Sequence, residues 1–269
     1  MCFPSKRQKD NFTDEATKKP SKTQKGAESG KDTKAEKDST PAPTSTTTPP
    51  APIAPSLVPA SSTTEKMAPR VAIIVYSMYG HINTMAKSIQ AGVKSAGGDA
   101  KIFRIAETLS DDILGKMHAP PKPADIDVLG PHDLVSYDAF LFGIPTRYGN
   151  MPGQWKAFWD ATGALWGQQA LAGKYAGLFV STASPGGGQE STFMNTMSTL
   201  AHHGIIYVPF GYKTAFADLC NLDEVHGGSP WGAGTFAAGD GSRQPSALEL
   251  GMAEKQGKYF YEIVSKVSF

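Results

Sequence analysis

The pattern of hydrophobic and polar positions separates a long polar segment from a region in which apolar runs alternate with amphipathic stretches. From residue 71 onward, short runs rich in β-branched and aromatic residues occur at 71–76, 100–105, 139–144, 175–181 and 205–210. Runs of this length predict strands, and a continuous one such as 71–76 is typical of a strand buried on both faces.

Helical patterns lie between most of these runs and after the last one, at 82–96, 154–162, 190–203 and 246–267. Five strands alternating with helices indicate a parallel sheet covered on both faces. Because crossover connections are right-handed, few topologies remain, and the commonest for five strands is the flavodoxin-like order 2-1-3-4-5. We therefore predict a doubly wound α/β domain with a ligand crevice at the carboxyl ends of strands 1 and 3.

The polar segment precedes this domain. Residues 1–66 contain eleven Lys/Arg and eight Asp/Glu, a net charge of +3, and almost no large apolar side chains. The segment is charged over 5–38 and rich in Pro, Thr, Ala and Ser over 40–64. Such a composition cannot bury enough apolar surface to offset the entropy of ordering. We predict a disordered tail over 1–68 and a folded domain over 69–269.

Charge and cysteine content exclude several classes of function. Residues 67–269 contain fifteen Lys/Arg and seventeen Asp/Glu, a net charge of −2, which predicts no nucleic-acid surface. Cys2 and Cys220 provide neither a disulfide framework nor a metal site, as is typical of a reducing compartment. No apolar run approaches the ~20 residues that span a bilayer, and no signal peptide is apparent. We expect a cytoplasmic protein without a metal.

A peripheral association with the plasma membrane is an alternative for the tail. Cys2 lies close to Lys6, Arg7 and Lys9, so S-acylation and the basic cluster would supply two membrane signals. An unmodified tail is the simpler interpretation.

The loop after the first predicted strand, 77–84, carries candidate binding chemistry. It enters a helix N-terminus, where backbone N–H groups and the helix dipole favour an anion. Ser77 and Thr84 add hydroxyls, and Gly80 permits close approach to the backbone. The loop has no Lys or Arg and no Gly-Lys-Ser/Thr ending, which favours a single phosphate over a triphosphate with magnesium. An ordinary strand-to-helix turn is the alternative.

Two further loops lie at the same predicted edge. The loop 145–152 presents Arg147, Tyr148 and Asn150 between two prolines, which favours a ligand wall over an ordinary surface turn. The loop 181–190 contains consecutive glycines that expose main-chain donors. A near match to the dinucleotide fingerprint at 232–237 neither follows a predicted strand nor opens a helix, so we interpret it as chance.

Five motifs now identify a resemblance. In order and at matching separations, they are 77–82 (SMYGHI), 145–151 (PTRYGNM), 186–190 (GGGQE), 200–204 (LAHHG) and 239–245 (GDGSRQP). Together they resemble the WrbA-type NAD(P)H:quinone oxidoreductases, specifically the fungal members. The resemblance covers the chain from Val71 to its end and none of the tail.

This resemblance implies FMN as cofactor and a homotetramer whose active sites lie between subunits. The residues that would hold the FMN phosphate are Ser77, Met78, Tyr79, Gly80, His81 and Ile82. Those that would border the isoalloxazine and its pyrimidine side are Thr146, Arg147, Tyr148, Ser181, Thr182, Ala183, Ser184, Pro185 and Gly186. The glycine loop is one residue longer than is usual in the family, and Pro185 has no N–H to donate.

The resemblance also implies that Trp166 and His202 face the open side of the flavin, where nicotinamide and quinone alternate. On sequence alone, Trp166 would be a packing residue and His202 a helix-end or surface residue.

These observations predict an enzyme that transfers two electrons from NAD(P)H through FMN to quinones and protects against quinone and oxidative stress. Two alternatives come from other classes: a flavodoxin-type one-electron carrier and a membrane-associated regulator with a flavin fold. A carrier is expected to have a strongly acidic face, whereas the net charge of residues 67–269 is only −2.

Overall fold

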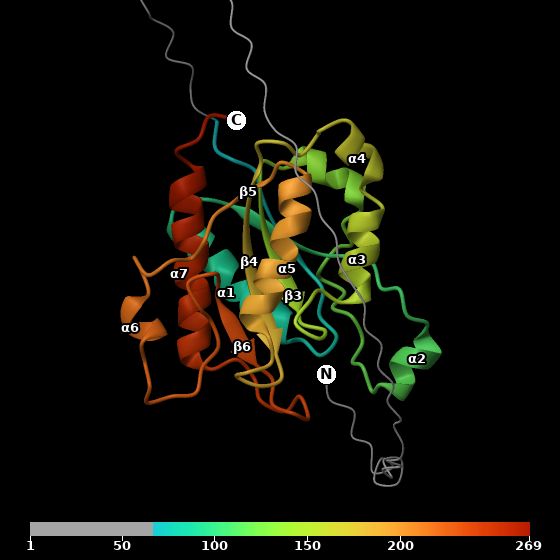
Figure 1. The fold of residues 1–269 in the computed structure, drawn as a ribbon, viewed down its shortest axis with the longest axis vertical. Coiled ribbons are helices and arrows are strands. Elements are labelled where there is room, and N and C mark those ends of the chain that lie inside the picture. Colours follow the sequence, from blue (N-terminus) through green and yellow to red (C-terminus); the bar gives the residue numbers. More distant parts are fainter. Residues whose placement is uncertain (1–66) are drawn as a thin grey trace, which may run out of the picture. The chain divides into compact units, whose positions relative to one another are not determined.

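The structure is a computed structural model that describes residues 67–269 (Figure 1). All but two residues of the predicted disordered tail, 1–68, therefore lie outside the described residues. Cys2 and the basic cluster beside it lie outside them as well.

A parallel sheet forms the centre of the domain. Its main strands are β1 (Val71–Val75), β2 (Ala100–Arg104), β3 (Ala139–Pro145), β4 (Tyr175–Thr182) and β5 (Ile206–Tyr207). They pair in the order β2-β1-β3-β4-β5, which confirms the flavodoxin-like topology predicted from the sequence. Every residue of β1 is buried, as expected for a strand covered on both faces.

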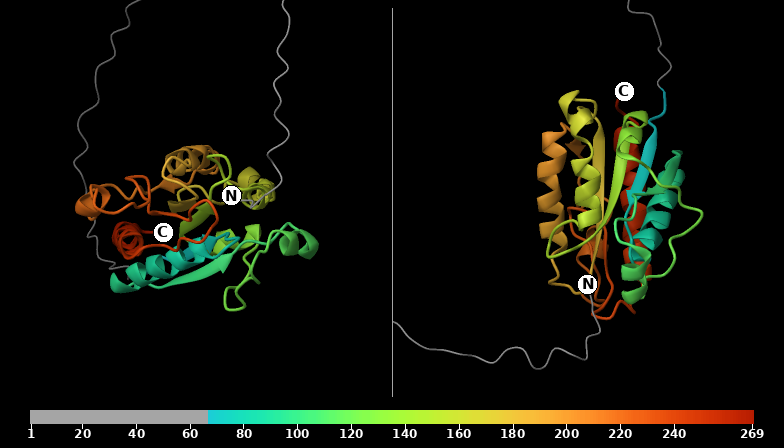
Figure 2. Two further views of the ribbon diagram at one scale, coloured as in Figure 1. Left: turned by 90° about the horizontal axis from the view of Figure 1, so that it is seen from below. Right: turned by 90° about the vertical axis from the view of Figure 1, so that its right-hand side faces the viewer.

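Helices cover both faces of the sheet (Figure 2). On one face, α1 (His81–Ser95) and α7 (Ala247–Val264) share a core with the odd-numbered residues of β1. On the other face, α3 (Gly153–Asp160) and α5 (Gln189–His202) share a core with its even-numbered residues. The alternation of side chains along β1 thus supplies two separate cores. The remaining short helices are α2 (Asp111–Lys116), η1 (Pro131–Ser136), α4 (Gly163–Gly167) and α6 (Phe216–Leu219).

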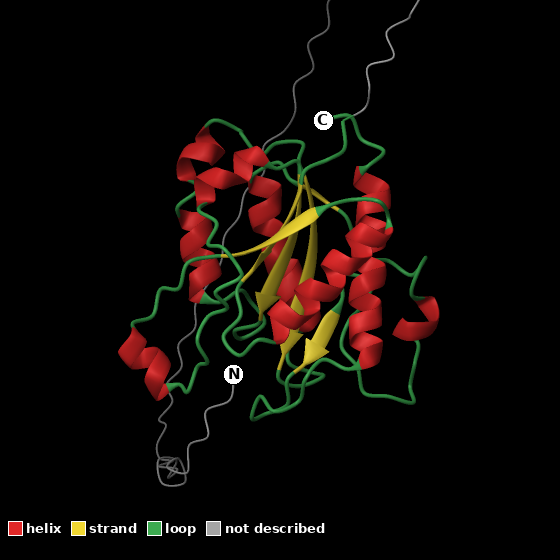
Figure 3. Cartoon of the chain, turned by 180° about the vertical axis from the view of Figure 1, so that it is seen from behind, coloured by secondary structure: helices red, strands yellow, loops and turns green. Residues whose placement is uncertain are grey.

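The edge beyond β4 differs from the prediction. The fifth strand was expected over 205–210, but β5 contains only two residues. The Val208 N–H still donates to the Ala176 carbonyl (2.8 Å), and the next residue, Pro209, has no N–H to continue the pairing. A sixth strand, β6 (Gly234–Phe236), pairs instead with the carboxyl end of β4 (Figure 3). It lies within 232–237, the segment interpreted above as a chance fingerprint.

The helices α1 and α7 meet through their backbones at two glycines. A Cβ atom on Gly92 would lie 1.9 Å from the Glu254 carbonyl oxygen, and one on Gly257 would lie 2.1 Å from the Ile89 carbonyl oxygen. Any larger residue would force the helices apart. The close contact therefore joins the later turns of the two helices.

No helix within residues 67–269 combines the length and the apolar character needed to cross a bilayer.

Candidate functional site

A cavity of about 270 Å³ lies at the carboxyl ends of β1, β3 and β4. Five segments line it: the loop entering α1, the loop after β3, the loop after β4, residues 117–118, and residues 237–241. Its position agrees with the crevice predicted from the strand order, because all parallel strands end at this edge.

Many of the predicted site residues meet in this cavity. The nine that line it are Ser77, Met78, Tyr79, His81, Thr146, Arg147, Ser181, Thr182 and Ala183. They come from three loops that are far apart in the sequence, so the fold alone brings them together.

The other residues predicted to bind the cofactor do not line the cavity. The Ile82 side chain is fully buried against the sheet. Gly80 lies between lining residues, and its left-handed backbone (φ +93°) forms the turn that enters α1. Tyr148 is 94% exposed on a tight turn and lines a shallower neighbouring cavity, which shares Arg147. Ser184, Pro185 and Gly186 form an exposed turn closed by a hydrogen bond from the Gly187 N–H to the Ser184 carbonyl.

Trp166 and His202 lie at the opposite end of the sheet. The helices α3 and α5 start at the carboxyl edge and run back, so α4 and the last turn of α5 reach the amino edge (Figure 1). The end of α5 lies beside the start of α4, because the His203 ring contacts Thr162 Oγ1 (2.8 Å) there. Both predicted catalytic side chains are exposed there. Within one chain, neither side chain lies beside the cavity, so their place at a flavin stays a prediction that needs a second subunit.

The start of α1 is suited to an anion. The helix has neither a side-chain cap nor an acidic residue in its first turn. The first hydrogen bond of the helix runs from the Thr84 N–H to the Gly80 carbonyl (3.0 Å). The N–H groups of His81, Ile82 and Asn83 therefore have no acceptor within the helix. These donors suit a single phosphate group.

The rest of the lining combines neutral donors with apolar surface. Thr146, Ser181 and Thr182 are buried and carry hydroxyls. Apolar walls come from Met78, Tyr79, Pro145, Ala183, Ala237 and Ala238. A phosphate-sized set of N–H donors beside hydroxyls and apolar side chains fits FMN, which combines one phosphate, a polyol and a planar ring.

A half-buried polar cluster lies beside the loop that enters α1. Glu107 accepts hydrogen bonds from Tyr76 Oη (2.9 Å) and Gln154 Nε2 (3.0 Å) and forms an ion pair with Lys122 (2.9 Å). Lys122 Nζ also donates to the Ser77 carbonyl (3.1 Å). Burial opposes ionisation of Glu107, but hydrogen bonds from Lys122, the Leu109 N–H and Tyr76 outweigh it and lower its pKa to about 2. This carboxylate therefore stays charged and tied to the cavity wall.

Sequence reasoning missed several lining residues, namely Met117, His118, Ala237, Ala238, Asp240 and Gly241. Asp240 and Gly241 belong to the 239–245 motif, which was noted in the sequence without any role in binding being assigned to it. His118 and Ala238 have left-handed backbones (φ +52° and +62°), for which their residue types give no signal.

Comparisons with known proteins agree with this site. Residues 69–215 match the family described as NADPH-dependent FMN reductase. The minor allergen Alt a 7 of Alternaria alternata is 64% identical over 201 residues, which cover 74% of this chain and 98% of that protein. NAD(P)H quinone oxidoreductase PST1 of Candida albicans is 60% identical over 197 residues, covering 73% and 98%.

A solved structure shares the fold. The flavodoxin-like, WrbA-like protein from Agrobacterium tumefaciens superposes with a TM-score of 0.51 at 21% identity, over 74% of this chain and 98% of that one. The family model covers more than half of the chain, and the curated relatives match over nearly their whole length. The chain therefore belongs to the NADPH-dependent FMN reductase family, as a WrbA-type member with fungal relatives and FMN as its cofactor.

Proposed function

We propose that this protein reduces quinones to hydroquinones with NAD(P)H, in a two-electron reaction that depends on FMN. The observation that carries the proposal is the cavity at the carboxyl edge, which combines an uncapped helix start, buried hydroxyls and apolar walls. Relatives that match this chain over 98% of their length are named NAD(P)H quinone oxidoreductase PST1 and quinone-oxidoreductase QR2.

The residues of this chain bind and orient rather than react. The first turn of α1 and Ser77 would hold the phosphate, and the Ser181 hydroxyl would bond the polar parts of the cofactor. The Thr146 and Thr182 hydroxyls, which already bond Thr192 (2.6 Å) and the Ser184 carbonyl (3.0 Å), would act there as acceptors. When bound, FMN would supply the redox chemistry: a hydride from NAD(P)H would pass through it to the quinone, which takes a further proton from water to become the hydroquinone. Arg147 is the only Lys or Arg that lines the cavity within the described residues.

Steady-state kinetics of the FMN-loaded protein would test the proposal, with NADH, NADPH and a panel of quinones. If nicotinamide and quinone use one open face in turn, double-reciprocal plots will be parallel and high quinone concentrations will inhibit. Intersecting plots would contradict this alternating use. Products reduced by one electron would favour the electron-carrier alternative, and absence of turnover with any quinone would exclude the proposed reaction.

We also propose that the active site is completed by a second copy of the chain within a homotetramer. Trp166 and His202 are exposed at the amino edge, away from the cavity of their own chain, so only another chain could place them beside a flavin. The segment after β5 adds exposed apolar side chains, Phe216, Leu222 and Val225, that suit a subunit contact.

Mixed oligomers would test this arrangement. One variant carries Trp166→Ala, and the other carries Gly80→Val and lacks FMN. If Trp166 acts across subunits, dissociating and reassociating the two inactive variants together will restore turnover. Failure to restore it in oligomers shown to contain both chains would contradict the proposal, and sedimentation of the wild-type protein would test the tetramer itself.

For the cell, we propose a protective role against quinone stress in a cytoplasmic protein, with peripheral attachment to the plasma membrane through Cys2 as the alternative location. The cysteine and the basic residues near it support that alternative. A Cys2→Ser variant that pellets with membranes as the wild type does would exclude the lipid anchor. Unchanged quinone sensitivity of cells that lack the protein would argue against the protective role.

A further inference from the structure

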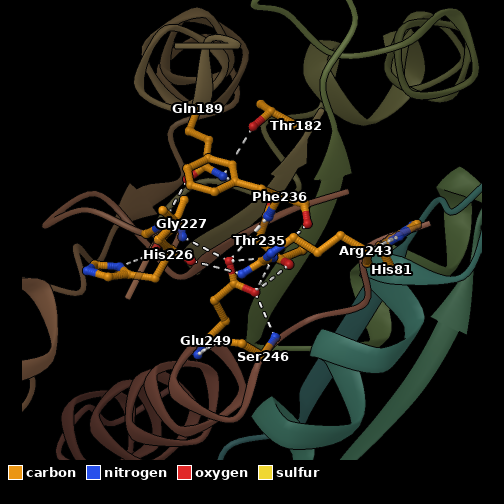
Figure 4. Close-up of polar contacts among 12 residues, drawn as sticks. His81, Thr182, Gln189, His226, Gly227, Thr235, Phe236, Arg243, Ser246 and Glu249 are labelled. Atoms are coloured by element: carbon orange, nitrogen blue, oxygen red, sulfur yellow. Dashed lines mark hydrogen bonds and ion pairs between the residues drawn. The ribbon is translucent and has the colours of Figure 1, made fainter. Parts of the chain in front are cut away.

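Glu249 is a fully buried carboxylate in the first turn of α7 (Figure 4). Its oxygens accept hydrogen bonds from Ser246 N–H (2.8 Å), Gly227 N–H (2.9 Å), Phe236 N–H (3.3 Å), Thr235 Oγ1 (2.8 Å) and Arg243 Nη1 (2.9 and 3.1 Å). A capping glutamate needs only the first of these. The others come from outside the helix, so Glu249 joins separate segments of the chain.

Arg243 extends this junction to the cavity. Its Nη1 also donates to the Phe236 carbonyl (2.7 Å), and its Nη2 donates to the Val225 carbonyl (3.0 Å). Its backbone N–H donates to the Ala237 carbonyl (3.1 Å) and so closes the segment 237–243 at its base. This segment supplies the cavity wall that contains Ala238 and Asp240.

The same arginine fixes the ring of His81, the first residue of α1. His81 is buried, lines the cavity, and contacts the Arg243 carbonyl oxygen through Nε2 (2.8 Å). Because a carbonyl oxygen only accepts, Nε2 must carry the proton. In the neutral ring, Nδ1 is then an acceptor.

Gln189 connects the loop after β4 to this network. Its Oε1 accepts from the Gly228 N–H (2.8 Å), while its Nε2 donates to the Thr235 carbonyl (3.0 Å) and to Thr182 Oγ1 (3.3 Å). Three segments that line the cavity are therefore held by one set of contacts, although neither Arg243 nor Glu249 lines it.

We propose that Arg243 and Glu249 are positioning residues for FMN, which set the 237–243 wall and the tautomer of His81 before the cofactor binds. A site whose walls are already in place spends less binding free energy on ordering them. The inference rests on FMN being the ligand of this cavity and deepens the proposed function by naming what shapes its cofactor site.

The test uses full-length apoprotein and FMN titration followed by fluorescence. Arg243→Lys keeps the charge, but a single ammonium cannot span Glu249 and both carbonyl oxygens. Loss of such supporting hydrogen bonds predicts an FMN Kd raised by about tenfold or more. Glu249→Gln keeps the volume and should act in the same direction. Arg243→Lys keeps the carbonyl oxygen that His81 contacts, so it acts on His81 only by releasing the 237–243 segment. In ¹⁵N spectra of the Arg243→Lys apoprotein, the population of the Nε2–H tautomer of His81 should fall below its wild-type value.

Ser246→Ala is the matched control, because it removes a cap from the same helix start and leaves the Arg243–Glu249 pair in place. It should lower the melting temperature but keep the FMN Kd within about twofold. Equal weakening of FMN binding in Ser246→Ala and Arg243→Lys at equal loss of stability would overturn the proposal. Unchanged affinity with an unchanged His81 tautomer in Arg243→Lys would overturn it as well.

The wild-type protein provides a measurement that depends on no variant. If His81 carries its proton on Nδ1 in the apoprotein, the proposed contact with Arg243 is wrong. All of these readouts omit quinone and NAD(P)H. A protein that binds FMN as described but reduces no quinone would therefore contradict only the proposed function.

Discussion

At the scale of the residue, the charge on Glu107 links acid stability to the cavity wall. Its pKa falls from 4.5 to about 2 on folding, so its contribution to stability is present above pH 4.5 and is lost as the pH falls toward 2. We expect Glu107→Gln to lower the free energy of unfolding by about 1–2 kcal/mol at pH 7.

Urea denaturation between pH 7 and pH 2.5 would check this expectation. The gap in the free energy of unfolding between wild type and Glu107→Gln should narrow below pH 4.5. In that range the unfolded wild-type chain takes up a proton on Glu107, while the folded carboxylate stays charged until the pH approaches 2. Asp112→Asn is the control, because its ion pair with Lys116 is exposed and should contribute less than about 0.5 kcal/mol. A gap that does not change with pH would show that the charge of Glu107 is unimportant.

Gly80 permits a second residue-scale test. Its backbone is left-handed (φ +93°), yet a Cβ there would meet no atom within 4 Å, so the glycine is needed for its conformation rather than for space. Gly97 at the far end of α1 has the same properties (φ +82°). Each change to alanine should cost about 1–2 kcal/mol of stability. Only Gly80→Ala should also weaken FMN binding by titration; equal weakening in Gly97→Ala would contradict this.

At the scale of the element, the contact between α1 and α7 depends on Gly92 and Gly257. A Cβ on either would meet a carbonyl oxygen at about 2 Å, so alanine at either position should destabilise the protein by about 2–3 kcal/mol. Gly251 also lies in α7, but a Cβ there would meet no atom within 4 Å, so Gly251→Ala should be neutral or slightly stabilising. Thermal unfolding would compare the three variants, and equal melting temperatures would refute the tight contact.

Most of the helices and strands could be predicted from the sequence, and two strands could not. The order of the five strands and the four long helices were predicted, because their apolar runs and periodicities are local signals. The short β5 and the added β6 were not. Pairing at the end of β4 is decided by the missing N–H of Pro209 and by a strand contributed from nearly thirty residues further along, which no local pattern specifies.

The residues of the candidate site also fall into those that the sequence could predict and those that it could not. Loops that directly follow strands must meet at one edge, so residues such as Ser77, Thr146 and Ser181 could be placed from the topology. Ala238 and His118 come from long connections whose course is set by contacts such as those of Glu249 and Glu107. The role of Trp166 came only from the resemblance and stays a prediction, because a single chain places this residue away from the cavity.

At the scale of the whole molecule, residues 67–269 supply the cavity lining and both core layers that the structure describes. Removing residues 1–66 should therefore leave FMN affinity and quinone turnover within about twofold of the full chain. Parallel titrations and steady-state assays of the two forms would check this. A larger loss would mean that the tail contributes to the site.

The division of the outer edge of β4 between β5 and β6 has a consequence for behaviour at high concentration. An exposed edge strand offers unpaired backbone groups that can template growth by another chain, and long flat edges are the usual starting points of fibrils. Here that edge consists of two strands of two and three residues, separated by Pro209 and a long connection. Few consecutive backbone N–H and C=O groups remain for the strand of another chain to pair with. This edge therefore resists aggregation without needing charged side chains along it.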